Sequence, residues 1–226
     1  MSNFLSVSIG RKFLMSITGI FMMLFICVHL TLNLFLVFDD SGDLFNVGAN
    51  FMSTNPLIKI MEPILALGFI IHIIWAFIIY YNNYKTRPIG YAVTDRSYSS
   101  NWNARNMLVI GALVLTFLVI HLINFYCVIK FDSESMGQVT IDGTQMHNTY
   151  ALVAGLFKGS VIYGILYMVA GILLGFHLSH GFWSAFHTIG FNNENWIPRL
   201  IVVSKIFAVI VATGFSLIPL YFMIKF

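Results

Sequence analysis

The first apolar stretch of the chain decides the fold, and residues 11–38 read RKFLMSITGIFMMLFICVHLTLNLFLVF. Within this stretch, no Asp, Glu, Lys or Arg follows Arg11 and Lys12. A bilayer core about 30 Å thick requires roughly 20 apolar residues in one helical span, and this stretch exceeds that length. It is also longer than the apolar core of a signal peptide, and no small-residue cleavage site follows it. We therefore expect it to remain in the protein as a transmembrane helix.

Four further stretches have the same character, at residues 57–84, 106–131, 160–190 and 197–224. Hydrophobic residues make up 58% of the 226 residues and charged residues only 9%, a composition that excludes a soluble domain of this size. Lipid cannot satisfy exposed backbone polar groups, and the alternation of a barrel strand is absent. The sequence predicts an all-α integral membrane protein with five transmembrane helices in a single domain, residues 1–226.

Basic residues gather at one end of the predicted spans. That end holds Arg11, Lys12, Lys85, Arg87, Arg96, Arg105 and Arg199, whereas the other end holds fewer lysines and most of the acidic residues. Positive charge favours the cytoplasmic side of a membrane, so we expect a cytoplasmic N-terminus. This bias accounts for how the net charge of +3 is distributed, so the charge requires no nucleic-acid partner.

Four histidines fall near the middle of four successive predicted spans: His29, His72, His121 and His177. An ionisable side chain at membrane depth costs about 3 kcal/mol on insertion scales, so each is expected to face the protein interior and to have a partner. One such histidine is as often a packing residue as a ligand. One in each of four spans indicates a common role.

The depths of these histidines divide them into two pairs. Counted from the charged residue that bounds each span at the acidic end, His29 and His121 lie 10 and 9 residues deep, whereas His72 and His177 lie 13 and 19 residues deep. At about 1.5 Å per residue the two layers differ by several ångströms or more. We predict an outer pair, His29 with His121, and a cytoplasmic-side pair, His72 with His177.

Haem suits two-histidine layers better than a bare metal ion does. Zinc requires three or four convergent ligands, whereas haem supplies four itself and needs only axial imidazoles in an apolar pocket. The sequence therefore predicts two bis-histidine b haems. His180 competes with His177 as the ligand on the fourth span, and these arguments favour neither strongly. His187 is either a partner of a haem propionate or an interfacial residue, and His147 is assigned no role.

Two segments carry a resemblance to a known family: SVSIGRKFLMSITGIFMMLFICVHLTLNL at residues 6–34 and FHLSHGFWSAFHTIG at residues 176–190. With one histidine in each of the first four spans, they resemble the two-haem cytochrome b anchor of succinate:quinone oxidoreductases, in its five-helix form from menaquinone-using bacteria. The resemblance covers essentially the whole chain. It implies that four of the five helices form the haem-binding bundle with the same histidine pairs. The family pattern H-x-x-x-G falls on His177 and Gly181, which favours His177 over His180.

The resemblance also implies partners and a location. A flavoprotein subunit with FAD would carry the dicarboxylate chemistry of a succinate dehydrogenase or fumarate reductase, and an iron–sulfur subunit would relay electrons to the cytoplasmic-side haem. The chain itself would carry electrons in the bacterial cytoplasmic membrane, and a dimer of such complexes is compatible with this role. Some family members carry an acid, proposed to conduct protons, two positions before the fourth-span ligand. Gly175 stands there, which puts such a path in doubt.

Glu62 is the one carboxylate within a predicted span. Quinone chemistry needs a group that gives or takes protons beside a haem at the membrane edge, and Glu62 is the candidate near the outer haem. The alternative is that it pairs with Lys59 at the interface.

Two other functions remain open at this stage. The chain could be the cytochrome b subunit of another membrane oxidoreductase, although a bc-type protein places two ligands on each of two helices. It could instead be a proton-coupled transporter with a histidine relay, but the sequence has no internal repeat and no pair of interrupted helices.

Overall fold

A computed structural model describes residues 8–85 and 102–225. The described residues contain five helical segments long and apolar enough to cross a membrane. Their bounds are α1 (Ser8–Phe38), α3 (Pro56–Lys85), α6 (Met107–His121) continuing through η2 (Leu122–Tyr126) into α7 (Cys127–Phe131), α9 (Val161–Thr188) and α10 (Trp196–Lys225). This confirms the predicted all-α membrane fold, and each segment agrees with its predicted span to within three residues.

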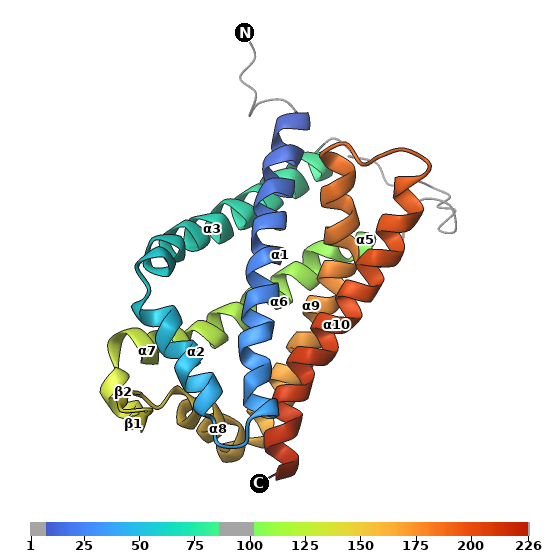
Figure 1. The fold of residues 1–226 in the computed structure, drawn as a ribbon. Coiled ribbons are helices and arrows are strands. Elements are labelled where there is room, and N and C mark those ends of the chain that lie inside the picture. The colour runs from blue at the N-terminus through green and yellow to red at the C-terminus, as the bar shows by residue number, and fades with distance from the viewer. Residues whose placement is uncertain (1–7, 86–101, 226) are drawn as a thin grey trace.

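The long helices alternate in direction between the two ends of the bundle (Figure 1). We call the end where α1 begins the N-terminal end and the end where α10 finishes the C-terminal end. Helix α3 packs beside α1, α6 packs beside α9, and α9 and α10 form the most extensive helix pair. The short helix α5 (Trp102–Arg105) precedes α6 and packs against the part of α9 around Phe176 and Ser179.

Small residues let α9 and α10 approach closely. A Cβ atom on Gly175 would lie 2.8 Å from the Cβ of Ala212 and 3.0 Å from the carbonyl oxygen of Ala208. Such contacts between small residues are typical of membrane helices, whose association depends on packing rather than on escape from water. Helix α9, which carries His177, is thereby packed closely against α10.

Several elements cover the C-terminal end of the bundle. They are α2 (Asp43–Thr54), η3 (Ser133–Met136), the hairpin of β1 (Gln138–Ile141) and β2 (Thr144–His147), and α8 (Thr149–Gly159). The hairpin turns at Asp142 and Gly143, both with positive φ, as a two-residue hairpin loop requires. Ser160 has extended backbone angles and separates α8 from α9.

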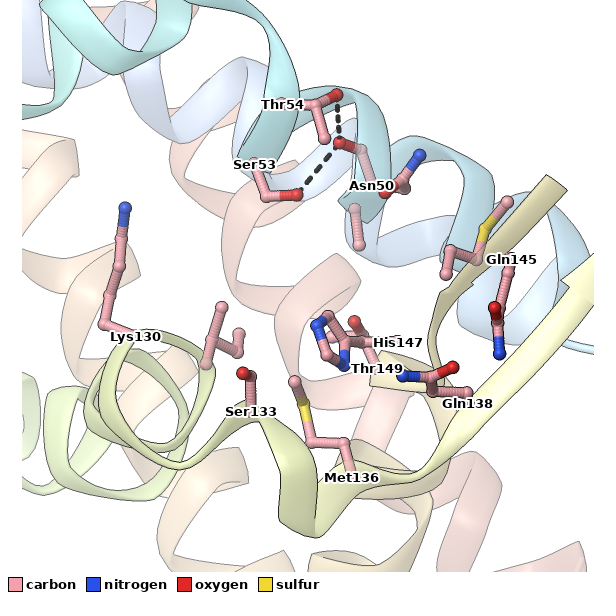
Figure 2. Close-up of a pocket in the computed structure, with 13 residues that line it drawn as sticks. Asn50, Ser53, Thr54, Lys130, Ser133, Met136, Gln138, Gln145, His147 and Thr149 are labelled. Carbon is pink, nitrogen blue, oxygen red and sulfur yellow. Dashed lines mark hydrogen bonds between the residues drawn. The ribbon is translucent and has the colours of Figure 1, made fainter.

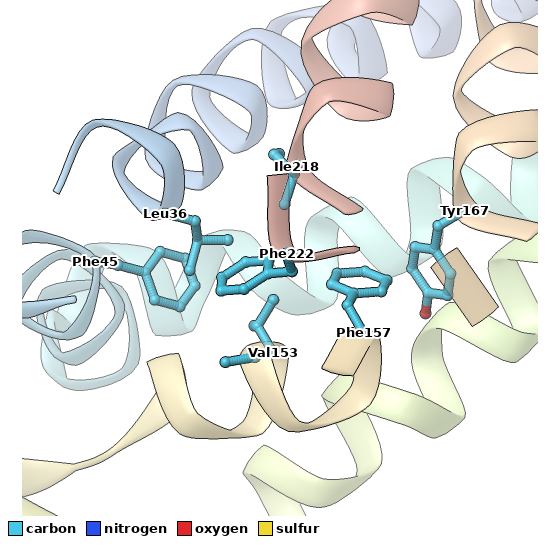
Figure 3. Close-up of a cluster of buried hydrophobic side chains, with 8 residues drawn as sticks. Leu36, Phe45, Val153, Phe157, Tyr167, Ile218 and Phe222 are labelled. Carbon is cyan, nitrogen blue, oxygen red and sulfur yellow. The ribbon is translucent and has the colours of Figure 1, made fainter. Parts of the chain in front are cut away.

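A buried apolar cluster joins this covering layer to the spans (Figure 3). Phe222 of α10 and Leu36 of α1 are both fully buried and meet Phe45 of α2 together with Val153 and Phe157 of α8. Tyr167 of α9 also belongs to it, and because residues from five helices share one cluster, the layer is held against the ends of the spans.

The first turn of α2 is anchored by an acidic residue. Asp39 accepts hydrogen bonds from the backbone N–H of Leu44 at 2.9 Å and from Ser41 at 3.1 Å, and its side chain also accepts from the Ser41 hydroxyl. These hydrogen bonds, of which the one from Leu44 has the largest effect, hold the pKa of the Asp39 carboxyl below its usual value.

The predicted charge asymmetry appears along the bundle axis. Arg11, Lys85 and Arg199 lie at the N-terminal end, on α1, α3 and α10, and Arg105 lies on α5 beside α9. Arg87 and Arg96 belong to the same prediction but lie outside the described residues. The compartment that this end faces stays a prediction.

Candidate functional site

The first histidine pair lies nearer the C-terminal end. His29 on α1 and His121, the last residue of α6, have ring centres 5.8 Å apart and ring planes at 90°. Helices α1 and α6 thus bring together two side chains 92 positions apart in the sequence, from His29 to His121.

Aromatic rings enclose this first pair. Phe25 stacks on His29 at 5.2 Å, and Phe215 of α10 lies 5.8 Å from it between ring centres. Phe125 and Tyr167 lie 5.3 Å and 6.1 Å from His121. The imidazoles therefore meet among aromatic side chains rather than in a cluster of charged groups.

The second pair lies toward the N-terminal end. His72 on α3 and His177 on α9 have ring centres 6.4 Å apart, with planes at 64°. A Cβ atom on Gly19 would lie 3.7 Å from Cε1 of His72, and one on Gly111 would lie 3.5 Å from Cε1 of His177.

The two pairs occupy different levels of the bundle. Gly19 and Gly111 lie against the second pair, and each precedes the histidine of the first pair on its own helix by ten residues. Ten residues of α-helix correspond to about 15 Å. Helices α1 and α6 thus present histidine at one level and glycine at the other.

Hydrogen bonds orient two of the four imidazoles. The Thr18 hydroxyl donates to the carbonyl of Leu14 at 2.9 Å, so its oxygen is available as an acceptor for Nδ1–H of His72 at 3.3 Å. That tautomer leaves Nε2 of His72 with a free lone pair, as a metal ligand requires. The Asn33 amide donates to the His29 carbonyl at 2.8 Å and lies 3.5 Å from Nδ1 of the same residue.

The other two imidazoles have an unsatisfied polar atom. Nδ1 of His121 and Nδ1 of His177 are buried and have no hydrogen-bond partner in the described part of the chain. A buried polar atom without a partner is costly unless a further group binds there. Each pair contains one such residue.

The separation within each pair suits two ligands of one metal centre. Two imidazoles that coordinate a metal from opposite sides have ring centres about 6 Å apart, because each ligating nitrogen lies about 2 Å from the metal. The observed 5.8 Å and 6.4 Å match this value. No group of three or more His, Cys, Asp or Glu side chains that could hold a metal occurs within residues 8–85 and 102–225. The pairs therefore fit a group that brings its remaining ligands with it, such as haem.

A π-helical turn directly follows His121. In η2 the backbone N–H of Cys127 donates to the carbonyl of Leu122, five residues earlier. One extra residue in a helix rotates the remainder of that helix by about 100°, and such turns are frequent at functional sites. His121 can therefore face His29 on α1 while Lys130, nine residues later, reaches Glu62 on α3. No local feature of the sequence predicts this turn.

Glu62 is held by two groups from the neighbouring span. Lys130 Nζ lies 2.7 Å from one carboxylate oxygen, and the Tyr126 hydroxyl donates to the other at 2.6 Å. The side chains of Lys130 and Glu62 are 36% and 31% exposed. The alternative prediction, in which Glu62 pairs with Lys59 on the same helix, is wrong, because the partner is Lys130. The ion pair crosses from α3 to α7 at the C-terminal end, the end nearer the His29–His121 pair.

The remaining histidines lie apart from the two pairs. His180 packs against Trp183 with ring centres 5.3 Å apart, whereas His177 packs against His72. His187 is exposed and lies 6.2 Å from Trp183. The geometry thus favours His177 over His180 as the partner of His72.

A polar cavity of about 470 Å³ opens in the layer that covers the C-terminal end (Figure 2). Its walls come from α2, α7, η3 and the hairpin, and Lys130 lies at one side. His147 lines it with a buried Nδ1 that has no partner among the described residues. Sequence reasoning missed this cavity because α7, which belongs to a predicted span, meets α2, η3 and the hairpin only in the tertiary structure.

Comparison of the chain with protein-family models, with curated proteins and with solved structures found no match.

Proposed function

We propose that this chain is the cytochrome b membrane anchor of a succinate dehydrogenase or fumarate reductase complex, and that it carries electrons through two bis-histidine b haems. The single observation that supports this most is the pair of two-imidazole sites, at two levels of one bundle, with ring centres 5.8 Å and 6.4 Å apart. The sequence resemblance supplies the identity of the complex.

Haem bound at these sites would supply reversible one-electron chemistry at a potential set by its axial ligands and surroundings. The chain would provide the rest. His29 and His121 would hold one group, His72 and His177 the other. Aromatic rings line the first pair, and Thr18 lies within hydrogen-bond distance of Nδ1 of His72 and would orient its ring. Gly19 and Gly111 leave room beside the second pair.

Quinone would react at the C-terminal end, where Glu62 lies. A quinol loses two protons as it is oxidised, and the Glu62 carboxylate would accept one of them. Lys130 occupies one oxygen and Tyr126 the other, so protonation of Glu62 would displace one of these partners. The ion pair would therefore hold the carboxylate in position until it is protonated, and protonation would break one of the two contacts. Menaquinone is the quinone that the family resemblance favours.

The soluble partners would bind at the opposite end. The N-terminal end carries Arg11, Lys85 and Arg199 and lies nearer the His72–His177 pair. An iron–sulfur subunit docked there would exchange electrons with that pair, and a flavoprotein subunit beyond it would carry the dicarboxylate chemistry. In this arrangement the N-terminal end faces the cytoplasm of a bacterium.

A proton relay in a transporter is the second candidate, and the surroundings of the histidines argue against it. A relay requires groups that pass protons between neighbours, whereas the first pair is enclosed by phenylalanines and the second is flanked by glycines. These surroundings suit a flat apolar cofactor better.

Two substitutions on α9 test the proposal. His177→Ala should reduce the haem content of the purified chain from two to one, because it removes one axial ligand of the second pair. His180→Ala is the matched control, three residues away, and should keep both haems and the low-spin b-type spectrum. Haem-to-protein ratio and reduced-minus-oxidised spectra are the measurements. Full haem content in His177→Ala, or no haem in the wild-type chain purified from haem-replete cells, would refute the proposal.

A further inference from the structure

Helix α2 is confined to one end of the bundle by its connections. Four residues join the end of α1 at Phe38 to the start of α2 at Asp43, and one residue joins Thr54 to the start of α3 at Pro56. The 12 residues of α2 span about 18 Å, too short to cross the roughly 30 Å bilayer core. Figure 1 shows α2 between the C-terminal end of α1 and the beginning of α3. Both of its ends are therefore tied at one membrane boundary.

One face of α2 is fastened to the protein. Phe45 and Asn46 are buried, and Phe45 belongs to the cluster shared with α8 and α10. The Asn46 side chain accepts from the backbone N–H of Tyr150 at 2.8 Å and donates to Asn148 at 3.3 Å. These contacts set which residues α2 turns outward.

The outward face is an apolar stripe. Leu44, Val47 and Phe51 are 54%, 45% and 56% exposed, and their spacing places them on one side of the helix. Asn50 and Ser53 lie on a different face and line the polar cavity. Three large exposed apolar residues in a row would be unfavourable in water, where burial of each such side chain is worth about 1.5–3 kcal/mol.

An apolar groove of about 420 Å³ lies beside this stripe, between α1 and α2. Gly48, Met52 and the stripe residue Phe51 form its α2 side, and Leu32 of α1 packs closely against Gly48. The hydroxyl of Thr31 in the groove donates to the carbonyl of Cys27 on its own helix at 2.8 Å. The groove thus presents hydrocarbon, with its one hydroxyl already satisfied.

We propose that α2 is an interfacial helix immersed in the lipid leaflet at the C-terminal end, with its apolar stripe among the acyl chains and one lipid acyl chain in the groove. The lipid is the occupant because stripe and groove continue the apolar surface of the five spans at the level where those spans end. Helix α2 contains no lysine or arginine, so apolar burial rather than attraction to anionic headgroups drives its insertion. The proposal is independent of the haem proposal.

Spin labels on the full chain in phosphatidylcholine bilayers test it. Labels would be placed at Leu44→Cys and Phe51→Cys on the stripe and at Ser53→Cys as the matched control on the cavity face, in a background with Cys27 and Cys127 replaced by alanine. Power-saturation measurements compare relaxation by oxygen, which concentrates in lipid, with relaxation by a water-soluble nickel chelate. We expect oxygen to dominate at both stripe positions and nickel at position 53.

Nickel dominance at both stripe positions, in variants whose circular dichroism matches the wild-type chain, would overturn the interfacial placement. Two stripe positions are used so that one misfolded variant does not decide the result. A label at Met52→Cys tests the groove separately. Oxygen dominance there supports an acyl chain in the groove, whereas nickel dominance shows a water-filled groove and refutes that part.

Discussion

The ion pair between Glu62 and Lys130 should be detectable as an energetic coupling between α3 and α7. The perturbations are Glu62→Gln, Lys130→Met and the double variant. Nζ lies 2.7 Å from the carboxylate, but both side chains are about one third exposed. Pairs of this kind contribute up to about 1 kcal/mol, and a hydrogen bond to a charged group contributes about 1.5–3 kcal/mol before solvent screening. We therefore expect a coupling free energy of about 1 kcal/mol.

The assay is the free energy of unfolding of the chain in mixed micelles, measured for all four proteins of the cycle. A second cycle with Lys59→Met is the matched control, because Lys59 lies on the same helix as Glu62 but is not its partner in the structure. That cycle should be additive to within about 0.3–0.5 kcal/mol. Coupling with Lys59 and none with Lys130 would refute the observed pairing and restore the interpretation of an ion pair within α3.

Glu62→Gln also tests the proposed role of the carboxylate. It keeps the shape of the side chain and the acceptor for Tyr126 but cannot take up a proton at neutral pH. Quinone-linked turnover of the intact complex should be lost, while both haem spectra and succinate oxidation with an artificial acceptor stay unchanged. Normal quinone-linked turnover would exclude Glu62 from the quinone site.

Two further predictions concern stability. Gly175→Ala should lower the free energy of unfolding by about 1–3 kcal/mol, because the added methyl would lie 2.8 Å from a Cβ on α10. The control is Gly155→Ala, where the added Cβ meets nothing within 4 Å. It should be neutral or stabilising in the same thermal unfolding assay. The hydrogen bond from the Leu44 N–H lowers the pKa of Asp39, so the ionised Asp39 carboxylate stabilises the folded state. This stabilisation is present above the pKa of an unfolded aspartate, about 3.9, and is lost as the pH falls through the lowered pKa of the folded state. Asp39→Asn should flatten this acid-side decline in a pH series of unfolding curves, and an unchanged decline would contradict the assignment.

Local properties of the sequence were sufficient to predict the spans and the levels of the histidines within them. Whether a segment crosses a membrane depends on its own length and apolarity, so all five spans were predicted within a few residues. The depth of a residue along a span depends only on its position in that span. Counting depth therefore paired His29 with His121 and His72 with His177, and the structure brings the same side chains together.

Counting depth along a span could not predict which side chains of neighbouring helices are in contact. Glu62 could be placed near the membrane boundary, but its partner depended on how α3 and α7 are rotated about their axes, and the π-turn after His121 changes that rotation. The same holds for His177 against His180, which differ by three residues in depth but point in different directions.

The layer at the C-terminal end depended most on tertiary structure. Helix α2 and helix α8 are short, and short helices in water are marginal on their own propensity. They are stabilised by Phe45, Val153 and Phe157 packing on Leu36 and Phe222 from two different spans. Because that cluster joins residues from opposite ends of the chain, no local window of sequence contains the information that forms it.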